Sequence, residues 1–310
     1  MTPEIFAQWL RAQGHEVIRT QSCYWYSPGW RTYQAFPYHW VIKPSEEELS
    51  ELLRTHKVLC LRYSTTMTAP CGHVSYHVVC SDREYDLRGL TKWARKNVRR
   101  GLRNCVVEPM PFGRLAEEGW ALQVDTQHRQ GRRLAMCRDD WRNLCLTAGS
   151  LPGFAAWGAF VDGRLGASLI TFQMDDCCYM LYQQCHRRYL ELHVNNALTF
   201  VVTNTVMQRG NVRSIFYALQ SLDARTSMDE YKFRMGYTPR SVRQRVVFNP
   251  WVSPLVNGVT HAVLKRIVNV RSGDPTLSKA EGLMRFYVEG KRPLHEQSLP
   301  EPLRKVTNNS

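Results

Sequence analysis

The segment GFAAWGAFVDGRLGASLITFQMDDCCYMLYQQC, residues 153–185, decides the fold of this chain. Three largely apolar runs are separated by two short polar pairs, Asp162-Gly163 and Asp175-Asp176. Asp-Gly is a preferred pair for the type I′ turn that joins neighbouring antiparallel strands. The segment therefore predicts three antiparallel strands in succession, at 153–161, 164–174 and 177–185.

Helical and extended patterns surround these three strands. Two helices are expected between residues 114 and 149, and a third helix at 193–209 ends before Gly210, which suits a C-terminal cap. A strand at 211–220, a short helix at 226–236 and a last strand at 241–248 complete the region. The resulting order is helix, helix, three strands, helix, strand, helix, strand, which predicts an α/β (α+β) fold with a mixed central sheet.

The flanking parts of the chain have patterns of their own. We expect a helix at 3–13, an aromatic, turn-rich stretch at 14–43, a helix capped by Ser45, and strands at 57–63 and 73–80. Helices are expected at 259–268 and 278–290, before a polar end that should fray. We therefore divide the chain into an N-terminal α/β lobe (1–107) that ends in a basic helix, a central domain (108–250) and a helical C-terminal extension (251–310).

The basic helix is the sequence TKWARKNVRRGLRN, residues 91–104, which contains six cations and no acid. At about 100° per residue, the cations cover an arc of roughly 140°, and Leu90, Ala94, Val98 and Leu102 lie opposite. Either the stripe faces an anion, or it is a solvated basic surface. The expected anion-binding groove consists of Lys92, Arg95, Lys96, Arg99, Arg100 and Arg103.

The overall composition also favours a polyanionic ligand. The chain has 310 residues, is 44% hydrophobic and has a formal net charge of +14. A core can therefore form, and a nucleotide cofactor, a tRNA or an acidic surface is a suitable partner. No run of 18 apolar residues and no targeting segment stands out, and the ten cysteines are scattered. We expect a cytoplasmic protein with reduced thiols and without integral membrane contact.

The segment CGHVSYHVVC contains the residue types of a zinc site, with Cys71, His73, His77 and Cys80. On a strand, the first three side chains share one face and Cys80 lies on the other. Four zinc ligands have to converge tetrahedrally, which a straight strand prevents. We therefore expect no metal.

Two motifs resemble those of the Fem-like or BioF2-like branch of the GNAT acyltransferase superfamily. In that branch a helix of the type K-x-R-x-x-I-R-R-A precedes the catalytic unit, and ARKNVRRGLRN is similar to it. The second motif, F-K-x-x-F-G, corresponds to YKFRMG, residues 231–236, which differs at Tyr231 and Met235 and retains Lys232 and Gly236. The resemblance covers about 114–248 and implies a GNAT fold, preceded by a smaller N-terminal lobe that is a degenerate copy of it.

The resemblance also implies where the acyl donor binds. In GNAT proteins the fourth and fifth strands run parallel and splay apart, and the main chain of strand four binds the pantetheine arm. The next helix directs its N-terminus at the pyrophosphate. The usual glycine-rich loop is absent here, since CHRRYLELHVNN contains no glycine. Arg187 and Arg188 are alternative phosphate ligands. The donor-binding candidates are Tyr182, Gln183, Gln184, Arg187, Arg188, Asn195 and Asn196.

Catalysis of acyl transfer needs stabilisation of an oxyanion and removal of a proton from the amine. The resemblance assigns charge stabilisation to Lys232, whose alternative is a solvated surface lysine. Tyr217 and Gln220 end strand five, where alternation prevents both from lining one cleft unless the strand bends. Asp223 is either a general base or a turn residue. The segment HRQGRR, with His128, Arg129 and Arg132, is expected to border the acceptor.

The activity that this analogy favours is N-acyl transfer from acyl-CoA to an amine acceptor, in a direct ternary complex. An aminoacyl-tRNA-dependent, Fem-like transferase is the first alternative, and the missing glycine loop favours it. A non-catalytic GNAT-fold protein that binds nucleic acid through the basic helix is the second. Each of the three readings requires a phosphate-bearing partner.

Overall fold

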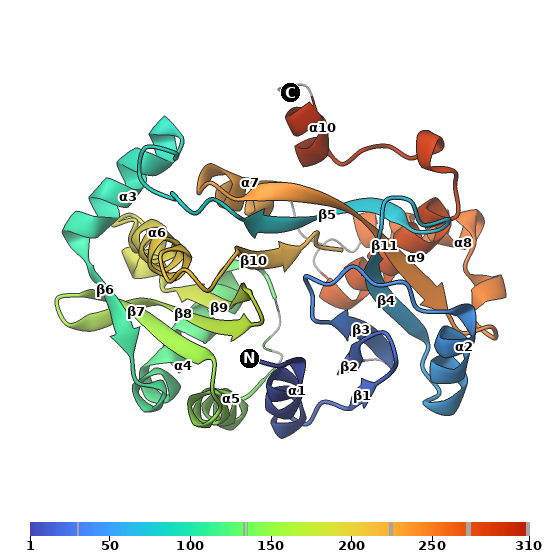
Figure 1. The fold of residues 1–310 in the computed structure, drawn as a ribbon, viewed down its shortest axis with the longest axis horizontal. Helices are drawn as coiled ribbons and strands as arrows, with labels where there is room; N and C mark the ends of the chain where they lie inside the picture. The colour runs from blue at the N-terminus through green and yellow to red at the C-terminus, as the bar shows by residue number, and fades with distance from the viewer. Residues whose placement is uncertain (30, 133, 135, 223–225, 271–273, 308–310) are drawn as a thin grey trace. The chain divides into compact units, whose positions relative to one another are not determined.

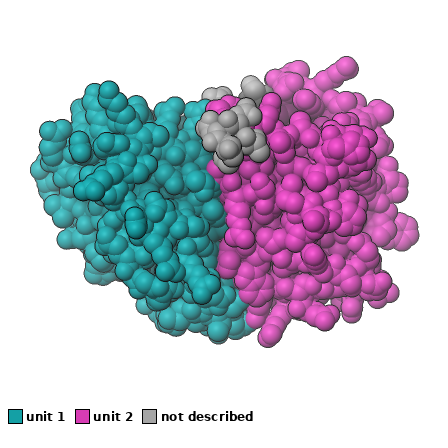
Figure 2. Space-filling model, turned by 45° about the horizontal axis from the view of Figure 1, so that its top comes forward, with its two compact units in different colours: residues 1–13, 78–218, 225–238 teal, residues 14–77, 219–224, 239–310 magenta. Residues whose placement is uncertain are grey.

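The computed structural model describes residues 1–29, 31–132, 134, 136–222, 226–270 and 274–307. The chain forms two compact units (Figure 2), each of which is built from segments that are not consecutive in the sequence. Unit 1 comprises residues 1–13, 78–218 and 225–238, and unit 2 comprises 14–77, 219–224 and 239–310. The predicted domains 1–107, 108–250 and 251–310 are consecutive in sequence, whereas each of these units combines several separate segments. That the three predicted domains fold separately stays a prediction.

Unit 1 contains a sheet with the strand order β10-β9-β8-β7-β6, in which β9 and β10 are parallel and the other neighbours antiparallel. Figure 1 shows these strands with their helices. The strands are β6 (Val106–Met110), β7 (Phe154–Val161), β8 (Arg164–Met174), β9 (Cys177–Cys185) and β10 (Ser214–Leu219). The helices are α1 (Pro3–Ala12), α3 (Lys92–Asn104), α4 (Phe112–Arg129), α5 (Arg138–Ser150), α6 (Val194–Met207) and α7 (Thr226–Arg234).

The three-strand prediction from residues 153–185 is confirmed by β7, β8 and β9. Asp162 (φ 49°) and Gly163 (φ 75°) both adopt left-handed backbone conformations, as a type I′ turn requires. Asp175 (φ 51°) is also left-handed in the second turn. These turns set the register that pairs Phe154 with Phe172 and Met174 with Cys177.

Helices cover both faces of the unit 1 sheet. On one face, the ring of Phe6 from α1 lies 5.3 Å from that of Phe172, and the buried Trp141 of α5 donates to the carbonyl of Leu115 in α4 at 3.3 Å. On the other face, α6 packs against the strands and α3 packs against α6. A sheet covered on both faces explains why β7 and β8 are apolar along most of their length.

Unit 2 repeats the connectivity of β7, β8, β9, α6 and β10 in a smaller form. Its strands have the order β1-β2-β3-β4-β11-β5, with β3 parallel to β4 and β11 antiparallel to β4. The repeated part is β1 (Val17–Arg19), β2 (Tyr24–Gly29), β3 (Thr32–Phe36), α2 (Glu46–Thr55) and β4 (Cys60–Thr65). The remaining elements are α8 (Gly258–Val270), α9 (Pro275–Gly290), α10 (Glu301–Thr307) and most of β5 (His73–Cys80) and β11 (Thr238–Phe248). The last three residues of β5 and the first residue of β11 are counted in unit 1.

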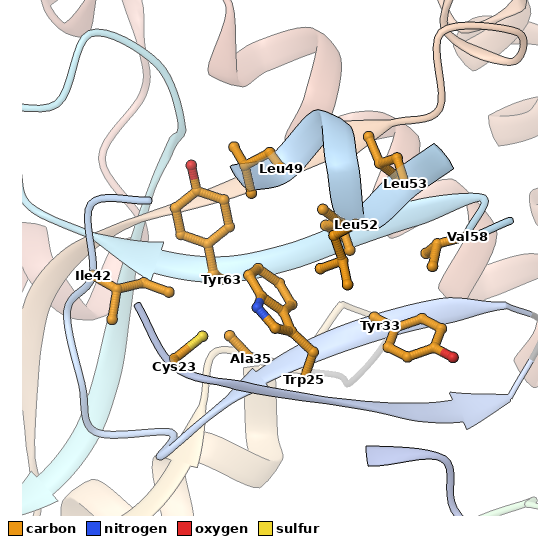
Figure 3. Packing of buried hydrophobic residues seen from close by; sticks show 11 residues of the cluster. Cys23, Trp25, Tyr33, Ala35, Ile42, Leu49, Leu52, Leu53, Val58 and Tyr63 are labelled. Atoms are coloured by element: carbon orange, nitrogen blue, oxygen red, sulfur yellow. The ribbon is translucent and has the colours of Figure 1, made fainter. Parts of the chain in front are cut away.

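The core of unit 2 lies between α2 and the strands β2, β3 and β4 (Figure 3). Trp25, which has no solvent exposure, packs among Leu49 and Leu52 of α2 and Tyr63 of β4. Ser45 caps α2 by accepting a hydrogen bond from the amide of Glu48 over 3.1 Å, which confirms the predicted cap. This core gives the N-terminal lobe its own hydrophobic centre, as a reduced copy of the fold requires.

Several sequence-based expectations about secondary structure were wrong. The stretch 14–43 contains β1, β2 and β3, whose alternation is hidden by their short lengths and by a register shift between Tyr26 and Gly29. β6 was missed because Pro109 interrupts its pattern, although proline is tolerated on an edge strand. Leu102 is 39% exposed rather than part of the inner face of α3. The expected frayed end contains α10 up to Thr307.

In the described part of the chain, no helix is long and apolar enough to cross a bilayer. The same residues contain no group of three or more His, Cys, Asp or Glu side chains arranged to hold a metal ion. Within unit 2, His77 is instead hydrogen-bonded through Nε2 to the hydroxyl of Ser64 at 2.8 Å.

Candidate acyl-transfer site

The parallel strands β9 and β10 of unit 1 pair over a short distance only. Ser214, Ile215 and Phe216 of β10 pair with Cys177, Cys178 and Tyr179 of β9. β9 then continues to Cys185 and β10 to Leu219. Within the described chain, no further residue of β9 pairs with a residue of β10. The two strands therefore part after Tyr179 and Phe216, as the GNAT resemblance implies.

Polar side chains fill the opening that begins at these positions. Tyr217, the first residue of β10 beyond the pairing, donates its hydroxyl to Gln183 Oε1 on β9. Gln183 Nε2 in turn donates to Asn195 Oδ1 at 2.8 Å and to Thr199 Oγ1 at 2.7 Å, both on α6. The hydroxyl of Tyr231 on α7 lies 2.8 Å from Thr199 Oγ1. Two strands and two helices thus contribute to one hydrogen-bonded cluster.

Lys232 lies at this cluster and is largely shielded from solvent. Its side chain is 12% exposed, and its ammonium group lies 5.1 Å from the centre of the Tyr217 ring. Lys232 Nζ also forms an ion pair with Asp229 Oδ1 at 2.8 Å, one helical turn earlier on α7, and that carboxylate is 8% exposed. The structure therefore does not support the alternative of a solvated surface lysine.

The tyrosines of the cluster are protonated at neutral pH. Burial raises the pKa of Tyr217 well above its ordinary value, and the neighbouring Tyr231 adds to the shift. Burial also raises the pKa of Tyr231, against the opposing effect of the Thr199 hydrogen bond. Both hydroxyls can therefore donate hydrogen bonds but cannot act as bases near pH 7.

Strand alternation separates the donor-binding candidates on β9. Gln183 faces α6, whereas Tyr182 packs edge-on to Trp9 and Trp141, and the buried Gln184 donates to Gln123 of α4. Tyr182 and Gln184 thus lie on the face away from the cluster. Asn195 belongs to the cluster, but the buried Asn196 contacts Met235 Sδ at 3.4 Å instead.

The backbone amides of the loop after β9 are already hydrogen-bonded within the protein. The amide of Arg187 donates to Asp125 Oδ2 at 2.8 Å, and the guanidinium of Arg187 also contacts that carboxylate. Arg188 donates its amide to His186 Nδ1 at 3.2 Å, and its side chain remains exposed. The amides of residues 189, 190, 192 and 193 donate to carbonyls within the loop. This loop therefore lacks the free, converging amides that bind a pyrophosphate.

The basic helix α3 lies beside the N-terminus of α6. A Cβ added to Gly101 of α3 would lie 2.4 Å from the carbonyl oxygen of His193, and Asn104 Nδ2 donates to the carbonyl of Leu192 at 3.2 Å. Burial lowers the pKa of His193, and the positive charges of Arg100 and Lys96 lower it further. The cations of α3 thus extend the positive end of the α6 dipole.

Five of the six predicted α3 cations are exposed. Arg95 is the exception, because its guanidinium is half-buried and donates to the carbonyls of Leu90 (3.0 Å) and Arg88 (3.2 Å). Within the described chain, the other five have no acidic partner within 4 Å. The exposed stripe consists of Lys92, Lys96, Arg99, Arg100 and Arg103.

The remaining candidates do not meet at the cluster. Gln220 belongs to unit 2, where its amide donates to the carbonyl of Tyr76 at 3.0 Å and its side chain accepts from Ser75 at 2.8 Å. Asp223 lies outside the described residues. Tyr217 and Gln220 do not line one cleft, as strand alternation predicts in the absence of a bend, because each has its own partners.

The expected acceptor loop begins at the end of α4. His128 is exposed, Arg132 is half-buried, and Arg129 Nη2 donates to the carbonyl of Cys185 at 3.1 Å. Arg129 therefore fixes the end of β9, a positioning role that the sequence did not indicate. Whether these residues contact an acceptor stays a prediction.

The two residues at which YKFRMG differs from F-K-x-x-F-G, Tyr231 and Met235, have specific surroundings in the structure. Tyr231 uses its hydroxyl to bond Thr199 and the carbonyl of Asn195 (3.0 Å), so it is not an apolar replacement. Met235 is fully buried. Gly236 adopts φ 85°, and an added Cβ would lie 3.0 Å from the Tyr85 ring. Sequence reasoning missed Tyr231, Thr199 and Asp229; the spacing of three between Asp229 and Lys232 was the available signal.

Known structures share this fold at low sequence identity. FemX aligns with a TM-score of 0.55 at 8% identity, covering 80% of this chain and 92% of FemX. The C-terminal domain (DUF2156) of a protein assigned as a lysylphosphatidylglycerol synthetase from Agrobacterium fabrum aligns with a TM-score of 0.54 at 10% identity, covering 87% and 93%. L-PGS from Bacillus licheniformis aligns with a TM-score of 0.51 at 10% identity, covering 94% and 98%.

No family model matches the sequence, and no curated protein matches it. The structural similarities confirm the predicted mixed α/β fold, which this chain shares with FemX and L-PGS. At 8–10% identity they establish the fold alone, and the chemistry depends on the residues of the site.

Proposed function

We propose that this protein is a transferase that moves an aminoacyl group from a tRNA carrier to an amine, with its reaction centre at the opening between β9 and β10. The observation that carries this proposal is the shielded ion pair of Lys232 and Asp229 beside Tyr217, at the point where the two strands part. In such a water-poor position, a fixed cation strongly stabilises developing negative charge.

The chemistry is consistent with that arrangement. The amine nitrogen attacks the carbonyl carbon of the aminoacyl ester, a C–N bond forms, and the C–O bond to the carrier breaks. The amine loses one proton, and the carrier oxygen takes up a proton and leaves as a hydroxyl. An oxyanion develops on the carbonyl oxygen during the attack. The ammonium of Lys232 has three N–H donors, and Asp229 accepts only one, so the others can face the oxyanion. Asp229 is then a positioning residue, because it holds the ammonium in place.

Two observations favour tRNA over acyl-CoA as the carrier. The loop amides that would hold a pyrophosphate are bonded within the protein. In addition, the stripe from Lys92 to Arg103 extends along about 17 Å of helix, at 1.5 Å per residue, which is long for one pyrophosphate but suits a nucleic-acid backbone. The stripe reaches the N-terminus of α6, where helix dipole and cations both favour phosphate.

The carrier is tested by tRNA binding at a series of salt concentrations. Substitution of Lys96 and Arg100 by serine should weaken binding about tenfold or more and reduce the salt slope by about 2, one for each lost phosphate contact. The matched control is Lys43→Ser with Arg164→Ser, since both residues are exposed. Equal losses in both double variants would show only a general charge effect and contradict a binding stripe.

The reaction itself is tested with purified protein, aminoacyl-tRNA labelled in the amino acid, and a panel of amines. We expect label to appear as an amide faster than in the absence of protein. Binding of CoA without binding of tRNA would instead favour the acyl-CoA reading. Binding of tRNA with no transfer to any amine would favour the non-catalytic alternative.

A further inference from the structure

Helix α8 of unit 2 presents large apolar side chains to solvent. Val259 is 74% exposed, Val263 52% and Ile267 41%, and their spacing of four places them on one side of the helix. The preceding segment continues the series with Trp251, which is 90% exposed, and Leu255. We call the exposed set the apolar ridge: Trp251, Leu255, Val259, Val263, Ile267 and Val270.

The opposite side of α8 accounts for the stability of the helix. α8 packs beside α9 (Figure 1), and His261 Nε2 lies 2.9 Å from Glu281 Oε1 of α9. Leu264 and Val268 are partly buried on that side. α8 therefore buries a different face against α9, and the ridge is a second apolar face that remains exposed. Six large apolar side chains in one exposed series exceed the scattered exposure that is normal for a protein surface.

The charges around the ridge indicate what covers it. From Asn249 to Gly273 the sequence contains no Asp or Glu, but it contains three Lys or Arg residues. Two of them, Lys265 and Arg266, are exposed on α8 itself. At about 100° per residue, Arg266 lies on the side of the ridge, whereas Lys265 lies nearer the opposite side of α8. An exposed apolar helix face with a cation beside it and a tryptophan in the preceding segment is typical of helices that lie in the headgroup region of a membrane.

We propose that the apolar ridge docks this protein on the surface of an anionic lipid bilayer. A symmetric contact between two copies is disfavoured, because it would bring Arg266 of both copies together without an acid from this segment. An anionic headgroup layer accepts the cations, and its acyl boundary accepts the ridge. This proposal concerns unit 2 only and does not depend on the reaction proposed for unit 1.

The test is co-sedimentation of the full chain with vesicles of phosphatidylcholine containing phosphatidylglycerol, at a salt concentration of about 0.15 M. We expect the wild-type chain to bind these vesicles and to bind pure phosphatidylcholine vesicles much less. The variant Val263→Ser with Ile267→Ser should bind at least about tenfold more weakly, because two apolar side chains no longer enter the bilayer. Leu146→Ser, at a 46% exposed leucine of α5, is the matched control and should bind like wild type.

The other outcomes also decide the proposal. Since the α3 stripe is basic too, Lys96→Ser with Arg100→Ser is tested in parallel. If this variant loses vesicle binding and the ridge variant does not, the contact is electrostatic and the ridge proposal is wrong. It is equally wrong if wild type fails to bind anionic vesicles, or if sedimentation equilibrium shows a dimer that only the ridge variant abolishes. Circular dichroism of each variant excludes loss of folding as the cause.

Discussion

Among the residues that the structure describes, two parallel strand pairs each join over three residues, but a further backbone segment completes only one of them. In unit 1, β9 and β10 pair over three residues and part; in unit 2, β3 and β4 also pair over three residues, from Thr32–Cys60 to Gln34–Arg62. Beyond the second pair, the amide of Ile42 donates to the carbonyl of Ser64 at 2.9 Å, so backbone of the same unit completes the strand. The Ile42 side chain joins the apolar core.

The difference teaches that strand topology alone does not make a binding site. In unit 2 the chain after β3 turns back, and an apolar residue completes the ladder. In unit 1 the corresponding position is occupied by hydroxyl, amide and ammonium groups from Tyr217, Gln183 and Lys232. Buried polar groups need hydrogen-bond partners, which are either other polar groups of the protein or a ligand. The β3–β4 pair of unit 2 therefore serves as an internal reference for a strand pair whose opening is closed by the protein itself.

The largest effect should come from the cation of the open site. Lys232→Ala removes the group that we propose faces the oxyanion, and we expect the transfer rate to fall by about 10²–10³ with tRNA affinity unchanged. Single-turnover kinetics and filter binding measure the two quantities. Lys279→Ala, at an exposed lysine of α9, is the matched control. A rate that falls only in proportion to tRNA affinity would make Lys232 a binding residue instead.

The next largest effect should be a loss of stability in unit 2, where Ile42 lies beside the β3–β4 pair. The transfer rate should not change. Ile42→Ala removes a 9% exposed side chain from the core cluster, and we expect the free energy of unfolding to fall by about 2–3 kcal/mol. Urea denaturation measures this loss, and the transfer rate at low temperature should match wild type. If Ile42→Ala also reduced the transfer rate tenfold while the protein remained folded, the opening in unit 2 would not be a passive reference.

Acid should destabilise the reference unit through its buried histidines. Burial, followed by the positive charge of Arg285, lowers the pKa of His73 to about 4, and burial, followed by Arg240, lowers the pKa of His77 to about 3. Since both pKa values are depressed on folding, the unfolded chain binds more protons below about pH 6.5. The stabilisation is complete above that pH and is lost as the pH falls toward 3–4.

Between pH 6.5 and 5, we expect the free energy of unfolding to decrease by roughly 2 kcal/mol for each histidine. Urea titrations at a series of pH values measure the slope. His77→Gln retains a polar partner for Ser64 but does not titrate, so it should reduce the slope by about half. A slope that is unchanged in His77→Gln would mean that this histidine is not buried in neutral form.

The smallest effect should come from a single hydroxyl. Tyr217→Phe removes the bond to Gln183 but keeps the ring beside Lys232, so we expect the transfer rate to fall about tenfold. Tyr33→Phe in unit 2 is the matched control, because it removes a hydroxyl of the reference core and should leave the rate unchanged. Equal rates for Tyr217→Phe and wild type would restrict the site to Lys232.

The fold was largely predictable where local chemistry decides the structure. Asp162-Gly163 predicts its turn because few other pairs adopt two left-handed conformations, and Ser45 predicts its cap through one hydrogen bond. β1, β2 and β3 were missed because their positions depend on pairing with distant strands. The short β6 depends in the same way on β7, since its exposed Val106 and its Pro109 resemble a loop in isolation.

The site was predictable only in part, from one motif residue and from the strand order that the resemblance implies. Lys232, Tyr217, Gln183 and Asn195 do meet, but alternation turns Tyr182 and Gln184 away, and only the packing against α4 and α5 shows this. The exclusion of Arg95 from the stripe depends on nearby carbonyls, which a helical wheel does not include. Thr199 and Tyr231 complete the cluster through bonds between residues 32 apart in sequence.

Hydrogen–deuterium exchange with and without bulk aminoacyl-tRNA compares the two strand pairs directly. We predict that the carrier slows exchange in Met180–Cys185, on the strand beyond the β9–β10 pairing, and leaves Gln34–Tyr38 of unit 2 unchanged. Slower exchange confined to α3, with Met180–Cys185 unaffected, would mean that the carrier binds only the basic stripe and would contradict a reaction centre at the open strands.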